Sequence, residues 1–237
     1  MNTIPSSSKI EETRIREAYK KRQKGSLYSW FSPGHLFLIQ EREREILKLL
    51  REKGIESLGD KRILEIGCGR GYWLRQFINW GARPENLTGI DLLSDRVAEA
   101  RQLSPEFVMI ECGNAEKLGC ADASFDLVLQ STVFSSVLDL SMKHQIAAEM
   151  LRVVKGDGLI LWYDFHMDNP INPDVRGVKK PEILQLFPNC RIELRRITLA
   201  PPLVRIVARY SWLVCYLLER LKIFNTHYIG IIQKSRA

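Results

Sequence analysis

The chain has 237 residues, 45% of them hydrophobic, which is enough for one large domain with its own core and excludes a disordered protein. The formal net charge is +7, with a strongly basic C-terminal third that suits nucleic acid, anionic lipid or a phosphate-bearing substrate, or that is simply a solvated face. The five cysteines lack close pairing and metal-ligand spacing. Neither a secretory signal nor a membrane-spanning apolar run is visible, so we expect a cytoplasmic protein.

Two helices are predicted near the N-terminus. Apolar residues recur at helical spacing in residues 10–24 and 35–53, and a glycine follows each of these segments. The stretch between them, SLYSWFSPG, is aromatic and loop-like. We expect residues 1–58 to form an N-terminal helical region and residues 59–237 to form the main domain.

Short β-branched runs alternate with amphipathic stretches of helix length from residue 61 onwards. The predicted strands are residues 61–66, 86–91, 107–111, 125–130 and 158–165. The predicted helices between them are residues 71–80, 94–103 and 139–154. This alternation predicts the α/β class, with a doubly wound, mostly parallel sheet that has helices on both faces. Binding sites in such sheets lie at the carboxyl ends of the strands.

The alternation stops after Phe165. A long polar loop precedes a short helix at 181–187, then two more strands at 190–200 and 226–234, with a helix at 203–222 between them. At 100° per residue, that helix would present one polar stripe and an otherwise mainly apolar surface. The stripe consists of Arg205, Arg209, Tyr216, Glu219 and Arg220. Such a helix would cover an acceptor, a second copy of the chain or an anionic membrane surface.

Three glycines, Gly67, Gly69 and Gly71, follow the first strand in the stretch ILEIGCGRGYWL. Glycine lets a ligand approach the main chain and permits backbone angles that other residues resist, and the helix that follows offers a positive N-terminus. A dinucleotide site of the G-x-G-x-x-G type would need its third glycine where this chain has Tyr72. The bulky phenol therefore argues against a nicotinamide dehydrogenase.

Together with Glu65, these glycines resemble the first motif of the class I methyltransferases that use S-adenosylmethionine. The resemblance extends over about residues 60–166 and the two final strands, and it implies a seven-stranded sheet whose last strand is antiparallel. It also implies an N-terminal helical lid, a helical insertion at 200–223 that caps the substrate, and S-adenosylmethionine as the cofactor, with no metal. The residues it places at the cofactor are Glu65, Gly67, Cys68, Gly69, Gly71, Asp91, Leu92, Asn114, Ala115 and Gln130.

Several of these positions have an expected partner on the cofactor. Asp91 ends the second strand, where a carboxylate accepts hydrogen bonds from the ribose hydroxyls. Asn114 and Ala115 would lie beside the adenine, although many members of the family have aspartate where this chain has Asn114. Gln130 would lie near the methionine half, and Cys68 is given no catalytic role.

Methyl transfer from a sulfonium mainly requires that nucleophile, carbon and sulfur are held in line. A weakly acidic acceptor such as a sugar hydroxyl also needs a base. His166 is the first candidate, because imidazole titrates near neutrality and this residue follows the fifth strand; Asp164 is the second and Tyr163 the third. The candidate acceptor-binding residues are Tyr28, His35, Tyr163 and Arg176.

The C-terminal region resembles that of bacterial methyltransferases in biosynthetic and cell-surface glycan pathways, which implies O-methylation of a small-molecule or glycan-like acceptor. A nucleic-acid methyltransferase is disfavoured, because the segment after the fourth strand lacks the Asn/Asp-Pro-Pro-aromatic pattern. The residues are also compatible with a lipid or quinone methyltransferase and with a non-catalytic partner subunit that binds the cofactor. A homodimer, and attachment of residues 203–222 to the inner face of the membrane, stay open.

Overall fold

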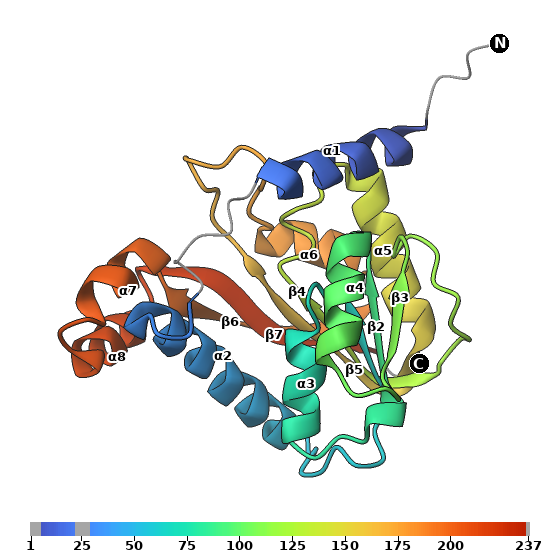
Figure 1. The fold of residues 1–237 in the computed structure, drawn as a ribbon, viewed down its shortest axis with the longest axis horizontal. Coiled ribbons are helices and arrows are strands. Elements are labelled where there is room, and N and C mark those ends of the chain that lie inside the picture. The colour runs from blue at the N-terminus through green and yellow to red at the C-terminus, as the bar shows by residue number, and fades with distance from the viewer. Residues whose placement is uncertain (1–5, 22–28, 236–237) are drawn as a thin grey trace.

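The structure is a computed structural model that describes residues 6–21 and 29–235 (Figure 1). Its centre is a seven-stranded sheet with the order β3-β2-β1-β4-β5-β7-β6. The strands are β1 (Ile63–Ile66), β2 (Leu87–Asp91), β3 (Met109–Cys112), β4 (Phe125–Ser131), β5 (Val154–Phe165), β6 (Cys190–Leu199) and β7 (Asn225–Lys234). β1 to β5 are parallel, whereas β7 pairs antiparallel with both β5 and β6. The predicted sheet, with its last strand antiparallel, is confirmed.

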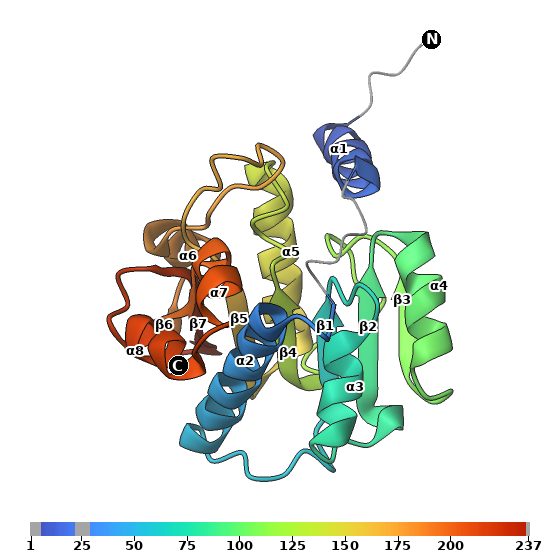
Figure 2. The ribbon, with the colours of Figure 1, turned by 60° about the vertical axis from the view of Figure 1, so that its left-hand side comes forward.

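Helices cover both faces of this sheet (Figure 2). One face carries α2 (Pro33–Glu52), α3 (Tyr72–Asn79) and α4 (Ser94–Leu103). The other carries α5 (Leu140–Val153) and α6 (Lys180–Leu186). The remaining elements are α1 (Ser7–Lys21), a 3₁₀ turn at Pro84–Asn86, α7 (Pro201–Val207) and α8 (Trp212–Arg220).

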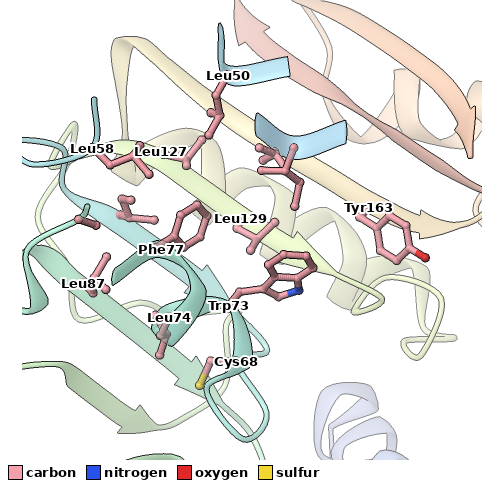
Figure 3. Packing of buried hydrophobic residues seen from close by; sticks show 14 of the residues in the cluster. Leu50, Leu58, Cys68, Trp73, Leu74, Phe77, Leu87, Leu127, Leu129 and Tyr163 are labelled. Atoms are coloured by element: carbon pink, nitrogen blue, oxygen red, sulfur yellow. The ribbon is translucent and has the colours of Figure 1, made fainter. Parts of the chain in front are cut away.

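The alternation of side chains along β5 shows how two cores arise from one sheet. Leu161 and Tyr163 point towards α2 and α3, and Figure 3 shows that core with Leu74 and Phe77 of α3, which are fully buried. Trp162, one residue away, packs on the opposite face among side chains from α5 and α6. Because successive strand residues face opposite sides, each apolar residue joins one core or the other. Each fully buried side chain of this kind contributes about 1.5–3 kcal/mol.

The helix predicted at 203–222 is wrong as one continuous element, because the chain forms α7 and α8 with a break between them. Pro201 and Pro202 occupy the first turn of α7, where a missing N–H costs nothing. Ser211 is extended and its side chain caps α8, accepting a hydrogen bond from the N–H of Val214 at 3.3 Å. The stripe predicted for a single helix therefore does not run unbroken along this segment.

Candidate functional site

The loop from Gly67 to Gly71 leaves the end of β1 in backbone conformations that favour glycine. The three glycines have φ values of 68°, 52° and 71°, in the left-handed region. The N–H of Gly67 donates to the carbonyl of Ile90 at 2.7 Å, which fixes the loop against β2. A Cβ at residue 67 would lie 2.4 Å from the side chain of Val133, so Val133 can pack this closely only because residue 67 is a glycine.

Asp91, the last residue of β2, ties the glycine loop to the neighbouring strand. Its Oδ2 accepts a hydrogen bond from the N–H of Gly69 at 2.8 Å, and its Oδ1 accepts one from the N–H of Leu93 at 2.9 Å. Burial raises the pKa of this carboxyl, although the two main-chain donors act in the opposite direction. Each oxygen keeps a further lone pair, because a carboxylate oxygen can accept two hydrogen bonds.

A cavity of about 750 Å³, part of it open to solvent, lies beside this carboxylate at the carboxyl ends of the strands. Its wall includes five of the ten residues predicted to contact the cofactor: Gly67, Asp91, Leu92, Asn114 and Ala115. The structure thus brings together loops that follow β1, β2 and β3, as expected for an open α/β sheet.

Three other predicted cofactor residues, Glu65, Cys68 and Gln130, are buried and do not line the cavity. Glu65 is 2% exposed, and burial followed by the charge of Asp91 raises the pKa of its carboxyl. Gln130 is fully buried and its Oε1 accepts a hydrogen bond from the N–H of Val133 at 3.2 Å. Burial also raises the pKa of the Cys68 thiol. These side chains, like Gly69 and Gly71, are not among those that line the cavity.

Helix α1, which lies in the region predicted as an N-terminal helical lid, forms part of the cavity wall through residues that the sequence did not single out. Ile15 and Tyr19 line the cavity from above the glycine loop, and the guanidinium of Arg96 lies 4.3 Å from the centre of the Tyr19 ring. Arg14 holds the helix in place by donating to the carbonyl of Ser136 at 2.6 Å. The remaining wall residues that sequence reasoning missed are Ile66, Ile90, Leu93, Gly113, Ser131, Thr132, Val133, Ser136, Val137, Met142 and Ile146.

The side chain of Asn114 is already engaged by acidic groups. Its Nδ2 donates to Glu12 of α1 at 2.7 Å and to Glu116 at 2.5 Å, while its Oδ1 accepts from the N–H of Glu116 at 2.9 Å. Asn114 therefore links α1 to the loop after β3. An adenine at this position would meet a side chain whose donors are in use.

The candidate bases lie near the end of β5 and do not line the cavity. Asp164 is fully buried, accepts hydrogen bonds from the N–H groups of Ser135 at 3.1 Å and Phe165 at 2.8 Å, and has its pKa raised to about 6 by burial. His166 is half-buried, and its Nε2 lies 2.9 Å from the carbonyl oxygen of Asn225.

The candidate acceptor residues are not gathered in one place. Tyr163 is buried on the α2 side of the sheet, where its hydroxyl lies 3.0 Å from Oγ1 of Thr198. His35 lies at the start of α2 with its ring 5.5 Å from that of Trp30, and burial lowers the pKa of its imidazole. Arg176 donates to Glu182 at 3.3 Å. The fourth candidate, Tyr28, lies outside the described residues.

Comparisons with known proteins agree with this geometry. A family model described as a methyltransferase domain matches residues 64–162. The chain is 30% identical over 117 residues to the phthiotriol/phenolphthiotriol dimycocerosates methyltransferase 1 of Mycobacterium ulcerans, covering 48% of this chain and 41% of that protein. It is 30% identical over 122 residues to the malonyl-[acyl-carrier protein] O-methyltransferase of Serratia marcescens, covering 51% and 44%. It thus spans less than half the length of these relatives.

A solved structure with the same fold covers more of the chain. It is the 1,6-didemethyltoxoflavin-N1-methyltransferase of Burkholderia thailandensis, in complex with 1,6-didemethyltoxoflavin and S-adenosylhomocysteine. The TM-score is 0.64 with 15% sequence identity, and the match covers 100% of this chain and 94% of the other. At this identity the likeness establishes the fold alone.

Proposed function

Since the chain belongs to the class I family of S-adenosylmethionine-dependent methyltransferases, we propose that it transfers a methyl group to an oxygen of a small-molecule or glycan-like acceptor. The observation that carries this proposal is the cavity between the glycine loop and Asp91. The oxygen acceptor is supported by the names of the curated relatives, several of which are O-methyltransferases.

The cavity residues fit an adenosyl sulfonium compound. Gly67 lines the cavity without a side chain, so a ligand can approach its main chain. Asp91 would hold the ribose hydroxyls with the lone pairs that its two main-chain donors leave. Ile15, Leu92 and Ala115 offer apolar walls for the adenine. When bound, S-adenosylmethionine supplies a methyl group activated by the positive charge on sulfur.

His166 is the base that we propose for a weakly acidic acceptor. The carbonyl of Asn225 can only accept a hydrogen bond, so Nε2 of His166 carries the proton in the neutral ring and Nδ1 is the atom that would accept a proton. Burial lowers the pKa of this imidazole, which keeps it in the neutral form that accepts a proton. For this role, the acceptor would have to reach from the cavity to the end of β5.

An acceptor with an acyl group is a second candidate. One relative is named for a malonyl acyl-carrier protein and another for fatty acids, and neither acceptor is a glycan. A nucleic-acid acceptor and a non-catalytic role are less well supported. Turnover measurements on a panel of acceptors distinguish these two functions from methylation of a small molecule.

The proposal is tested in two steps on one sample. Titration with S-adenosylhomocysteine and with NAD first identifies the cofactor, and we expect a response only to S-adenosylhomocysteine. Labelled S-adenosylmethionine is then offered with sugars, carboxylic acids, acyl thioesters and RNA. Tight binding of NAD alone would overturn the family assignment. Binding of S-adenosylhomocysteine without turnover on any acceptor would favour the non-catalytic subunit.

A further inference from the structure

The helices α7 and α8 protrude at one end of the molecule, on the left in Figure 1. Eight large apolar or aromatic residues of this segment have exposed fractions between 42% and 86%. They are Ile206, Tyr210, Leu213, Val214, Leu217, Leu221, Ile223 and Phe224. Phe31, which is 98% exposed, precedes the start of α2, and α2 packs against α7 there: a Cβ at Gly34 would lie 3.0 Å from the Cα of Arg205.

The exposed residues of α8 share one face of the helix. Leu213, Leu217 and Leu221 recur at a spacing of four, which places them on one side. The opposite side carries the buried Cys215. The helix is anchored on α2 by the ring of Phe37, which lies 5.1 Å from that of Tyr216. Within the described residues, no other part of the chain covers the outer face.

Positive charge accompanies this apolar face. Residues 200–224 contain four basic residues, Arg205, Arg209, Arg220 and Lys222. The one acidic residue in that range, Glu219, is partly buried beside Glu41, and burial raises the pKa of its carboxyl. The outer surface is therefore apolar with cationic side chains around it, which is the pattern of an interfacial helix on anionic lipid.

A polar cavity of about 850 Å³ lies beside α8 and extends the positive charge. Its charged lining comprises five basic side chains, Lys48, Arg195, Arg196, Arg220 and Lys222, and three acidic ones, Glu45, Glu52 and Glu219. Arg195 is already paired with Glu52. The excess of cations next to the apolar face suits the phosphate groups of a lipid surface.

We propose that α7 and α8 dock the protein on a membrane that contains anionic lipids. A symmetric dimer through the same face is disfavoured, because it would bring together two surfaces that both carry an excess of positive charge. The contact is interfacial: α8 has 9 residues, and among the described residues no helix is both long and apolar enough to cross a bilayer. The inference does not depend on the identity of the acceptor.

Vesicle sedimentation tests the proposal. The whole protein should bind vesicles of phosphatidylcholine with 30% phosphatidylglycerol at least about tenfold more tightly than phosphatidylcholine alone, because the basic residues are attracted to the anionic lipid. Added salt should weaken this binding by screening that attraction. The double variant Arg220→Glu/Lys222→Glu should lose this preference. The double variant Leu217→Asp/Leu221→Asp should lower binding at least about tenfold.

A matched control, Leu103→Asp/Phe107→Asp, replaces two exposed apolar residues that lie outside α7 and α8 and the segment between them. It should leave vesicle binding unchanged. All variants are first checked for an unchanged melting temperature and S-adenosylhomocysteine affinity, which separates this test from that of the proposed function. Absence of binding to the anionic vesicles, or binding that neither test variant reduces, would overturn the proposal. So would a dimer in solution that Leu217→Asp/Leu221→Asp dissociates while anionic vesicles are not bound.

Discussion

The carboxylate of Asp91 accepts a hydrogen bond from the N–H of Gly69 at 2.8 Å, so the end of β2 fixes the glycine loop that follows β1. The residue that we expect to hold the ribose therefore also shapes the main chain on which we expect the cofactor to rest. This double role makes the pair the centre of the proposed site.

Replacing Asp91 should weaken cofactor binding more than any surface change. Asp91→Ala removes the acceptor for the ribose hydroxyls and leaves the N–H of Gly69 without its partner. We expect the affinity for S-adenosylhomocysteine to fall by about 10- to 100-fold, since each hydrogen bond to a charged group contributes about 1.5–3 kcal/mol. Calorimetric titration measures this. Asp95→Ala, an exposed aspartate on α4, is the control, and equal affinities for the two variants would refute the role of Asp91.

A methyl group at residue 67 should disturb the cavity wall. Gly67→Ala places a Cβ 2.4 Å from Val133 at a φ of 68°, so strain and overpacking together should lower the unfolding free energy by about 2–4 kcal/mol. Gly54→Ala is the matched control, because its φ is 75° but no atom lies within 4 Å of the added Cβ. Denaturant-induced unfolding compares the two variants. An equally small decrease of the unfolding free energy in both would show that the side chain of Val133 moves aside at little cost.

His166→Ala should lower turnover by about 100-fold or more and leave the affinity for S-adenosylhomocysteine unchanged, because a base acts on the acceptor only. The comparison requires an acceptor that the protein methylates and a rate measured at saturating cofactor. His144→Ala, at an exposed position on α5, should keep full activity. Full activity of His166→Ala would remove this imidazole as the base.

The stability of the protein should fall as the pH rises above the usual pKa of a glutamate side chain. Burial, and then the charge of Glu219, raise the pKa of Glu41 to about 8, so the folded state holds a proton that the unfolded state releases near pH 4.3. The stabilisation is present below the unfolded pKa and is lost between about pH 4.3 and 8.

Glu41→Gln imitates the protonated form and can still accept from the N–H of Thr198. At pH 8 it should raise the melting temperature by about 3 °C or more, with a smaller gain at pH 5. Glu56→Gln, at an exposed site, is the control. An equal change at both pH values would contradict the buried proton.

The sequence predicted the parts of the site that depend on local spacing. Gly67 and Asp91 stand at the ends of adjacent strands, and the sheet topology alone brings them together. Ile15 and Arg96 were missed because their place in the cavity wall arises from tertiary packing of α1 and α4, which spacing does not encode.

Two other differences have the same kind of cause. The break between α7 and α8 coincides with the serine cap at Ser211. The spacing of apolar residues does not indicate this cap, so it predicted one continuous helix. Asp164 lies near the end of β5 and His166 follows that strand, which is separated from β1 by β4, so residues at the same edge of the sheet need not face one cavity. Their catalytic roles stay predictions.

A crystal structure of the protein with S-adenosylhomocysteine is the most direct measurement. It should show the adenosine between α1 and the glycine loop, with the ribose hydroxyls donating to Asp91. A nucleoside bound elsewhere, or a carboxylate of Asp91 that makes no contact with it, would contradict the proposed site.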